Sequence, residues 1–221
     1  MNYLLIILDA TPYFVFQLAD AKNIKSLGKV EKITAPAIWT LPSLTSMLYI
    51  PYYHATPYFN IKDLPEPVWL PSFLQRKGYK TVFIGDNPWF SLGRQILNRG
   101  FDHYHALPLN PRAVARKTLE YLEGKFFVLS FFTSTHYPYR EVPSRRKRRF
   151  EGDLGRHIEA VEYVDSLVGE ILRKVSRETE VVVTSDHGDV YRGNKNLGHN
   201  PKHLKEYTES LFKVFLVRGV V

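Results

Sequence analysis

The stretch that most constrains the fold runs from Val181 to Gly188 and reads Val-Val-Val-Thr-Ser-Asp-His-Gly. Three β-branched apolar residues in a row predict a buried strand, since the run is too short for a helix. Asp186 and His187 follow, and a carboxylate beside an imidazole at the carboxyl end of a buried strand is typical of a metal-ligand pair in an open α/β sheet. A polar turn whose Asp and His face solvent is the alternative, and this stretch alone leaves both open.

Apolar runs of this kind recur along the chain. We expect central strands at Tyr3–Leu8, Thr81–Ile84, Phe126–Phe132 and Val181–Thr184, with a short strand at 30–34 and a last one at 212–217. Helices are expected at 13–27, after Thr40, and at 71–77, 91–98, 110–123 and 154–175, the last with an apolar face of helical period. The pattern predicts one α/β domain over residues 1–221, a doubly wound, largely parallel central sheet with helices on both faces.

Length, charge and cysteine content exclude several classes of protein. The 221 residues suffice for one large α/β domain, and the absence of cysteine excludes a disulfide framework, a zinc ribbon and a thiol nucleophile. The net charge of +8 favours anionic partners without choosing among phosphate esters, nucleic acid and acidic lipid. The first residues lack a basic segment and a signal-peptide core, and no window approaches a membrane span, so the expected compartment is the cytoplasm.

Polar residues follow other predicted strands as well. Asp9 ends the first strand, and the Ala-Thr-Pro loop after it favours a site over a helix N-cap. His136 follows the strand that ends at Phe132, although a lone histidine in a loop rich in Tyr and Pro also fits a structural role. Asp86 and Asn87 could line the same site, and a type I turn explains them equally well.

Thr40 stands before a predicted helix that has Pro42 in its first turn, where proline is tolerated. One interpretation makes Thr40 the N-cap of that helix. In the other, its hydroxyl lies in the positive field of the helix N-terminus, where a metal could make it an alkoxide nucleophile. The two roles are compatible, and the sequence leaves both open.

Taken in order, these pieces resemble the alkaline phosphatase superfamily in its sulfatase-like branch, nearly from end to end. Thr40-Leu-Pro-Ser-Leu-Thr-Ser-Met-Leu48 stands in the place of the family's nucleophile motif. The other matching pieces, besides the strand that ends in Asp9, are the segments 78–85, 99–102, 136–139, 164–172, 185–188, 197–199 and 207–214.

The resemblance implies a site built around one divalent metal ion. Asp9, Asp186 and His187 are implied as its ligands, and Thr40 completes the ligand set as the nucleophile. Mixed oxygen and nitrogen ligands favour Mn or Zn, and Ca or Mg remain compatible. The residues expected to bind substrate are His136, His199, His203 and, from its place at a strand end, Asn87.

Three departures from the family pattern point away from sulfate esters. Thr40 stands where sulfatases carry the Cys or Ser that becomes formylglycine, Asp9 is followed by Ala10 instead of a second acid, and the stretch at 85–88 lacks the Lys and His of many sulfatases. A Thr nucleophile is similar to the phosphoglycerol and phosphoethanolamine transferases and the phosphodiesterases of the same branch. The resemblance therefore implies a metal-dependent hydrolase or phosphotransferase that acts on phosphate esters.

The expected partner is an anionic small molecule or a lipid-headgroup phosphoester. Nucleic acid is not expected, since no aromatic-interleaved platform or known nucleic-acid module occurs. Family members usually continue into a smaller C-terminal subdomain, so one side of the site is expected to be missing or built by a partner. A homo-oligomer is also compatible with the sequence. Two alternatives stay open: a protein of this family that acts on sulfate esters, and a non-catalytic anion-binding protein. The five cations at Arg145–Arg149 motivate the second, although such a run is also typical of a solvated loop.

Overall fold

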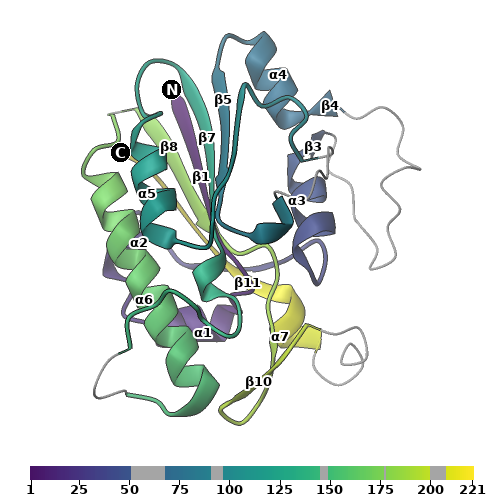
Figure 1. Cartoon of the computed structure of the whole chain (residues 1–221), viewed down its shortest axis with the longest axis vertical. Helices are drawn as coiled ribbons and strands as arrows, with labels where there is room; N and C mark the ends of the chain where they lie inside the picture. Colours follow the sequence, from purple (N-terminus) through teal and green to yellow (C-terminus); the bar gives the residue numbers. More distant parts are fainter. Residues whose placement is uncertain (51–67, 91–96, 145–148, 177, 200–207) are drawn as a thin grey trace.

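The apolar runs form the centre of a seven-stranded sheet in the computed structural model, which describes residues 1–50, 68–90, 97–144, 149–176, 178–199 and 208–221 (Figure 1). In their order across the sheet, the strands are β2 (Glu31–Thr34), β11 (Lys213–Val220), β8 (Thr179–Thr184), β1 (Asn2–Leu8), β7 (Phe126–Phe132), β5 (Lys80–Gly85) and β6 (His103–Ala106). Each predicted central strand is present, within two residues of its expected bounds.

The sheet is largely parallel, as predicted. β1 pairs in parallel with both β7 and β8, and β5 pairs in parallel with β6 and β7. The exception is β11, which runs antiparallel to β8 and β2. The connection from β8 to β11 begins at the carboxyl end of β8 and re-enters the sheet there through α7 (Thr208–Phe212), so β11 runs back along its neighbour (Figure 1).

Successive side chains of the central strands enter two separate cores, because side chains alternate between the faces of a sheet. Ile6 packs in the core beneath four helices, and the adjacent Ile7 packs in the core on the opposite face. The four helices on the first face are α1 (Tyr13–Leu18), α2 (Lys22–Lys25), α5 (Pro111–Leu119) and α6 (Gly152–Leu172). The opposite face carries α3 (Thr40–Leu48) and α4 (Leu70–Arg76) (Figure 1). The doubly wound α/β prediction is therefore confirmed.

The helix predicted over 13–27 is broken into α1 and α2. Asp165 on α6 stabilises the start of a separate helix at α2. Its buried carboxylate accepts hydrogen bonds from the backbone N–H groups of Asn23 (3.3 Å) and Ile24 (2.8 Å). Those N–H groups lie in the first turn of α2 and have no partner within the helix. The prediction of one continuous helix was wrong because this partner comes from a distant part of the chain.

Short elements complete the fold. They are the paired strands β3 (Tyr49–Ile50) and β4 (Val68–Trp69), the hairpin strands β9 (Val190–Arg192) and β10 (Lys195–Gly198), and the 3₁₀ turns Pro88–Phe90 and Thr133–Thr135. Most of the helix predicted at 91–98 lies outside the described residues. Among the described helices, none combines the length and the apolar character needed to cross a membrane.

Candidate functional site

The ends of the three central strands bring the predicted metal ligands together. Leu8 lies opposite Phe132 of β7, and Ile7 lies opposite Thr184 of β8, so Asp9 and the stretch that begins at Ser185 leave the sheet at the same level. The loops are also joined to one another. The Thr135 hydroxyl donates to the carbonyl oxygen of Asp9 at 2.7 Å, and the N–H of Thr11 donates to Oγ of Ser185 at 2.8 Å.

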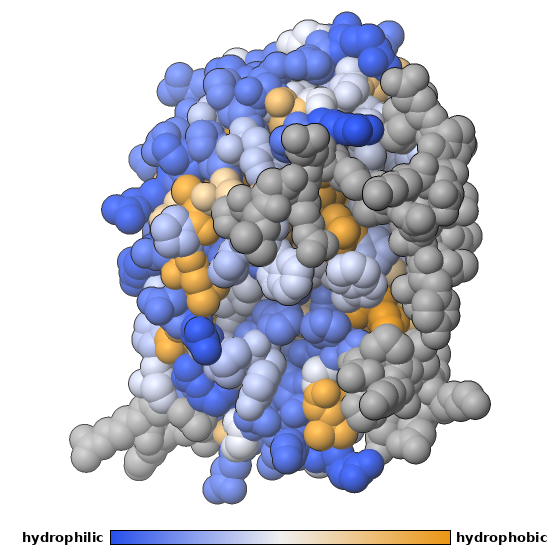
Figure 2. Space-filling model, turned by 45° about the vertical axis from the view of Figure 1, so that its right-hand side comes forward, coloured by the Kyte–Doolittle hydropathy of each residue, from blue (hydrophilic) through white to orange (hydrophobic). Residues whose placement is uncertain are grey.

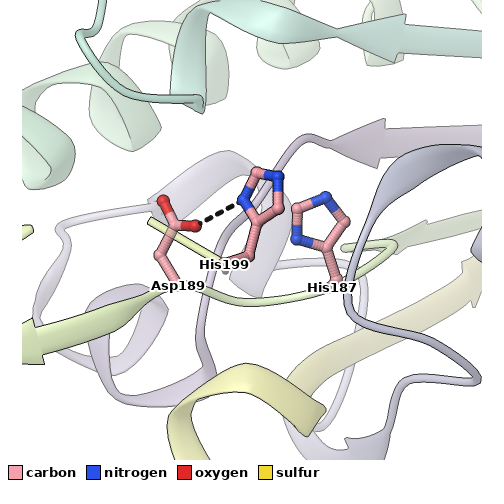
Figure 3. A group of neighbouring side chains, drawn as sticks. All are labelled: His187, Asp189 and His199. Carbon is pink, nitrogen blue, oxygen red and sulfur yellow. Dashed lines mark hydrogen bonds and ion pairs between the residues drawn. The ribbon is translucent and has the colours of Figure 1, made fainter. Parts of the chain in front are cut away.

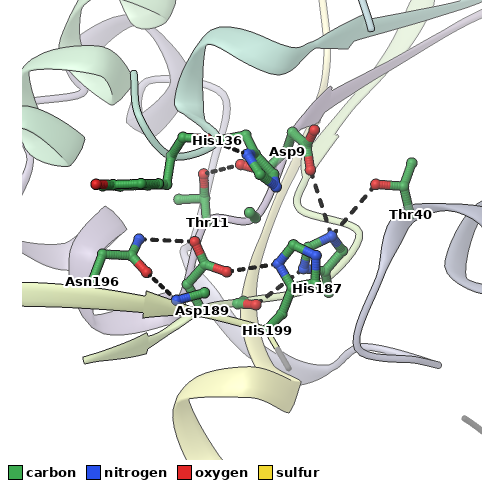
Figure 4. Close-up of polar contacts among 12 residues, drawn as sticks. Asp9, Thr11, Thr40, His136, His187, Asp189, Asn196 and His199 are labelled. Atoms are coloured by element: carbon green, nitrogen blue, oxygen red, sulfur yellow. Dashed lines mark hydrogen bonds and ion pairs between the residues drawn. The ribbon is translucent and has the colours of Figure 1, made fainter. Parts of the chain in front are cut away.

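A cluster of possible metal ligands lies at this edge (Figure 4). Nε2 of His187 lies 3.5 Å from each of three oxygen atoms, namely Oδ1 of Asp9, Oδ2 of Asp186 and Oγ1 of Thr40. These distances are long for hydrogen bonds. Four ligands that surround one ion tetrahedrally at about 2.1 Å lie about 3.4 Å from one another. The spacing therefore fits ligands that share one cation.

The unpaired oxygens of the cluster support the same conclusion. Both carboxylate oxygens of Asp9 and Oδ2 of Asp186 are buried and have no hydrogen-bond partner in the part of the chain that the structure describes. Burial, followed by the negative charge of Asp186, raises the pKa of Asp9 well above its usual value. Two buried carboxylates side by side can both remain ionised only beside a positive charge, and oxygen and nitrogen ligands of this kind suit Mn or Zn.

Backbone contacts orient the ligand atoms. Nδ1–H of His187 donates to the carbonyl oxygen of Gly188 at 3.0 Å, which leaves the lone pair on Nε2 for the site. Burial lowers the pKa of His187 and so keeps the ring neutral, as a metal ligand must be. Oδ1 of Asp186 accepts the N–H groups of His187 (3.0 Å) and Ala10 (3.3 Å), and Oδ2 remains free. Ala10 has a φ of 54°, an uncommon left-handed conformation that turns its N–H toward Asp186.

Gly188 is required by a close approach of two backbone segments. A Cβ at this position would lie 1.9 Å from the carbonyl oxygen of Ser210. The N–H of Gly188 donates to the carbonyl oxygen of Leu211 at 2.8 Å. The residue after the Asp-His pair therefore anchors this loop to the segment that leads into β11.

Thr40 reaches the cluster from α3, on the opposite face of the sheet from α6. The interpretation of Thr40 as an N-cap is wrong: the cap residue is Trp39, no side chain caps the helix, and Thr40 is the first helical residue. Its hydroxyl points toward His187 instead (Figure 4). In that position the hydroxyl lies in the positive field of the helix N-terminus, which favours negative charge on its oxygen.

Three of the four predicted substrate-binding residues lie beside the cluster. Asn87, His136 and His199 line a cavity of about 300 Å³ together with Thr40. The ring of His199 lies 4.5 Å from that of His187 and 5.2 Å from that of His136, measured between centroids. The fourth residue, His203, lies outside the described residues, as do positions 145–148 of the basic run.

Sequence analysis missed the carboxylate that orients His199. Asp189 is fully buried, and its Oδ1 lies 2.9 Å from Nδ1 of His199 (Figure 3). Although burial opposes it, the hydrogen bond from His199 lowers the pKa of Asp189 to about 2. Burial alone would lower the pKa of His199, but the hydrogen bond with Asp189 outweighs it and raises this pKa. The other ring nitrogen of His199 points away from Asp189 (Figure 3). The only signal in the sequence was a third polar residue directly after Asp-His-Gly.

His187, Asp189 and His199 form a second group whose potential ligand atoms lie within 4.8 Å of one another. This group shares His187 with the first cluster. Its other two members already form an ion pair with each other, so the group does not require a cation. The geometry therefore places the stronger demand for a metal at Asp9 and Asp186.

A chain of buried polar groups extends from Asp189 to the opposite side of the site. Nδ2 of Asn196 donates to Oδ2 of Asp189 at 2.9 Å and to the Tyr139 hydroxyl at 2.6 Å. The Tyr191 hydroxyl lies 2.7 Å from that of Tyr139 and 2.6 Å from Nδ1 of His157. Nε2 of His157 in turn lies 3.4 Å from the hydroxyl of Thr11, in the loop after Asp9. These polar contacts connect the β9–β10 hairpin to the loop after β1, and Figure 4 shows the contact between Asn196 and Asp189.

We expect His157 to make the protein sensitive to mild acid. Burial lowers its pKa to about 3, whereas an unfolded histidine titrates near its ordinary value of about 6.5. Below about pH 6.5 the unfolded chain takes up a proton that the folded protein refuses, so stability falls as the pH falls, by about 2 kcal/mol between pH 6.5 and 5. In His157→Gln the unfolding free energy should be lower at pH 7 but should lose about 2 kcal/mol less on acidification to pH 5. Urea unfolding of both proteins at the two pH values checks this, and parallel losses would contradict it.

Comparison with known proteins places this geometry in a family. The sequence profile of the sulfatase family matches residues 30–219. The chain belongs to the sulfatase family. A search of curated protein sequences found no significant match.

Several solved structures share the fold of this sulfatase-family chain. The C-terminal periplasmic domain of EcEptC from Escherichia coli, in complex with Zn, superposes with a TM-score of 0.76 at 14% identity, over 99% of this chain and 72% of that one. A protein in the alkaline phosphatase superfamily from Vibrio parahaemolyticus gives 0.72 at 18% identity, over 99% and 60%. The lipooligosaccharide phosphoethanolamine transferase A from Neisseria meningitidis gives 0.70 at 14%, over 99% and 47%. At these identities the likeness shows a common fold.

Proposed function

We propose that the protein is a metal-dependent hydrolase or phosphotransferase of phosphate esters, with Thr40 as its nucleophile. The observation that carries the proposal is the cluster at the strand ends. Three carboxylate oxygens of Asp9 and Asp186 are buried without a hydrogen-bond partner among the described residues. Nε2 of His187 lies 3.5 Å from an oxygen of each of these acids and 3.5 Å from the hydroxyl of Thr40. The structures with the same fold support this reading, since one is a complex with Zn and another is a phosphoethanolamine transferase.

Asp9, Asp186 and His187 would hold one divalent ion, and Thr40 would complete its ligand set. When bound, the ion lowers the pKa of a coordinated hydroxyl and stabilises negative charge on a phosphoryl oxygen. The protein's own contribution is orientation. The backbone contacts of Asp186 and His187 fix their free ligand atoms, and α3 presents the Thr40 oxygen to the same point.

The reaction proceeds through a covalent phosphothreonine in this proposal. Oγ1 of Thr40 loses its proton to solvent and forms a bond to phosphorus, while the bond from phosphorus to the leaving oxygen breaks and that oxygen takes up a proton to leave as an alcohol. His136 and His199 line the same cavity and can donate a hydrogen bond to the leaving oxygen. Water then attacks phosphorus and releases phosphate or a phosphomonoester, or a second alcohol takes the group instead. Thr40 is regenerated in either case.

We expect the enzyme to turn over p-nitrophenyl phosphodiesters or phosphomonoesters and to leave p-nitrophenyl sulfate unreacted. Thr40 cannot be converted to the formylglycine that sulfatases use, and the chain has no cysteine to take its place. The measurement is release of p-nitrophenol from each ester with Mn or Zn present. Rapid hydrolysis of the sulfate together with inert phosphoesters would assign the site to sulfate esters.

A further inference from the structure

The cavity beside Thr40 is lined by both polar and apolar side chains. Four of the described lining residues are polar, namely Thr40, Asn87, His136 and His199, and the other six are aromatic or aliphatic and are called the apolar wall. The other described residues that line it are Trp39, Leu41, Trp89, Phe90, Leu97 and Tyr104. Four aromatic rings and two leucines therefore lie next to the point where the proposed function places a phosphoryl group.

The two tryptophans are presented by elements that also carry the site. Trp39 directly precedes Thr40 at the start of α3, and Trp89 lies in the 3₁₀ turn that follows β5 and Asn87. Trp39 is 38% exposed and Trp89 is 57% exposed, although large aromatic side chains usually lose most of their contact with water on folding. On the described part of the face in Figure 2, hydrophilic residues predominate and apolar ones form small separate patches. Two partly exposed indole rings that line one cavity suit a ligand with an apolar group.

A packed aromatic layer supports this wall from below. The ring of Phe90 lies edge to face against Phe83 at 4.9 Å and against Phe131 at 5.0 Å. The ring of Tyr104 stacks on the same Phe83 ring, with 4.6 Å between the ring centroids. These contacts hold Phe90 and Tyr104 in place before any ligand arrives, so the wall is preformed and little ordering is needed on binding.

The described lining of the cavity offers no Lys, Arg, Asp or Glu side chain to pair with a second ionised group on the substrate. The nearby carboxylate of Asp86 is buried and accepts hydrogen bonds from the N–H groups of Thr133 and Asn110, so it is not directed at a ligand. The overall net charge of +8 further disfavours a cationic substituent.

We propose that the phosphoester accepted by this site carries an uncharged apolar group, a ring or an alkyl chain, that packs against Trp39 and Trp89 while the phosphoryl group lies at Thr40. This inference rests on the proposed function, because it takes the Thr40 end of the cavity to be the phosphoryl site. Trp39 and Trp89 are then the residues that determine specificity.

Phosphonates test the inference because they cannot be hydrolysed and all carry the same anionic head. The dissociation constants of methylphosphonate, hexylphosphonate and benzylphosphonate are measured by calorimetry on the intact protein with Mn or Zn present. Benzylphosphonate, hexylphosphonate or both should bind at least ten-fold more tightly than methylphosphonate. The tighter of the two shows whether the substituent is a ring or a chain.

Substitutions of the two tryptophans test whether these residues contact the apolar group of the ligand. In Trp89→Ala and in Trp39→Ala, the ratio of benzyl or hexyl affinity to methyl affinity should fall to near one, and Trp89→Phe should retain much of the preference. Phe73→Ala is the matched control, since Phe73 is an aromatic residue with 39% exposure on α4 that does not line the cavity. It should bind all three phosphonates as the wild type does. Thermal unfolding of each variant establishes that it is folded.

The outcomes separate this inference from the proposed function. If methylphosphonate binds and the larger phosphonates bind no more tightly, or if the preference survives both Trp→Ala substitutions, the apolar subsite is wrong and the phosphoryl site stands. Tightest binding of 2-aminoethylphosphonate or of the phosphonate analogue of phosphocholine would also overturn it, because the group would then be cationic. If the metal binds but no phosphonate does, the proposed function fails and the inference fails with it.

Discussion

Replacing Thr40 by alanine should lower the turnover of phosphoesters by about 10³-fold or more while the protein remains folded. The substitution removes the proposed nucleophile. It removes no helix cap, because the cap position belongs to Trp39. The Thr40 side chain is partly exposed, so its truncation should change the unfolding free energy by no more than about 1 kcal/mol. Turnover of a p-nitrophenyl phosphodiester and urea unfolding measure the two effects.

Two further variants make the result specific to the Thr40 oxygen. Thr40→Ser keeps a hydroxyl at the same place and should retain much of the rate. Thr45→Ala, on the same helix, removes a hydroxyl that donates to the carbonyl oxygen of Leu41, and it should leave turnover close to that of the wild type. Quenching the wild-type reaction during turnover should trap a phosphorylated Thr40 peptide that mass spectrometry detects. A Thr40→Ala protein with nearly wild-type rate would mean that water attacks directly or that the site lies elsewhere.

The core of the site was predictable because it depends on strand ends. Asp9 and the Asp186–His187 pair follow short apolar runs, and parallel strands that lie side by side end at one edge of the sheet. Periodicity and composition placed each of these residues at the end of a strand, and the resemblance to a family implied that they share one site. Thr40 is a different case, since it reaches the cluster from a helix on one face of the sheet. No local pattern fixes that placement, and only the resemblance to a family indicated it.

What the sequence could not predict depends on contacts between distant segments. The orientation of His199 by Asp189 requires the β9–β10 hairpin, whose strands are too short to show an alternating pattern. The break between α1 and α2 follows from Asp165, which lies 141 residues after Ile24 in the sequence. In each case a buried polar side chain takes hydrogen bonds from another part of the chain, and such pairing carries no local signal.

The second large effect is expected for Asp9→Asn. This substitution should raise the free energy of unfolding in the absence of metal and lower it in the presence of metal, relative to the wild type. Without a cation, the buried carboxylate of Asp9 faces the negative charge of Asp186 and makes no hydrogen bond shorter than the 3.5 Å contact with His187 among the described residues. Its raised pKa means that the folded protein holds this proton more tightly than the unfolded chain does, so ionised Asp9 destabilises the fold at neutral pH. Asparagine carries no charge. The metal-free variant should therefore be more stable than the metal-free wild type, by about 1–3 kcal/mol.

With metal bound, the wild type should be more stable than Asp9→Asn. Loss of a contact that only orients a ligand typically weakens metal affinity 10–100-fold, and loss of a charged ligand should cost at least as much. At a metal concentration 100 times the wild-type dissociation constant, the wild type gains about 2.7 kcal/mol. Asp9→Asn should gain little at that concentration. Urea unfolding with a chelator and with Mn or Zn gives all four free energies.

Asp165→Asn distinguishes this reversal from the general effect of removing a buried acid. Asp165 is also buried, but its oxygens accept hydrogen bonds from the backbone N–H groups of Asn23 and Ile24, and it lies outside the metal cluster. Asparagine there loses an acceptor, so the variant should be destabilised equally with and without metal, and its metal-induced gain should match that of the wild type. If Asp9→Asn instead behaves like Asp165→Asn, with lower stability in both conditions and an unchanged metal-induced gain, Asp9 is a structural acid and the ion is held by other residues.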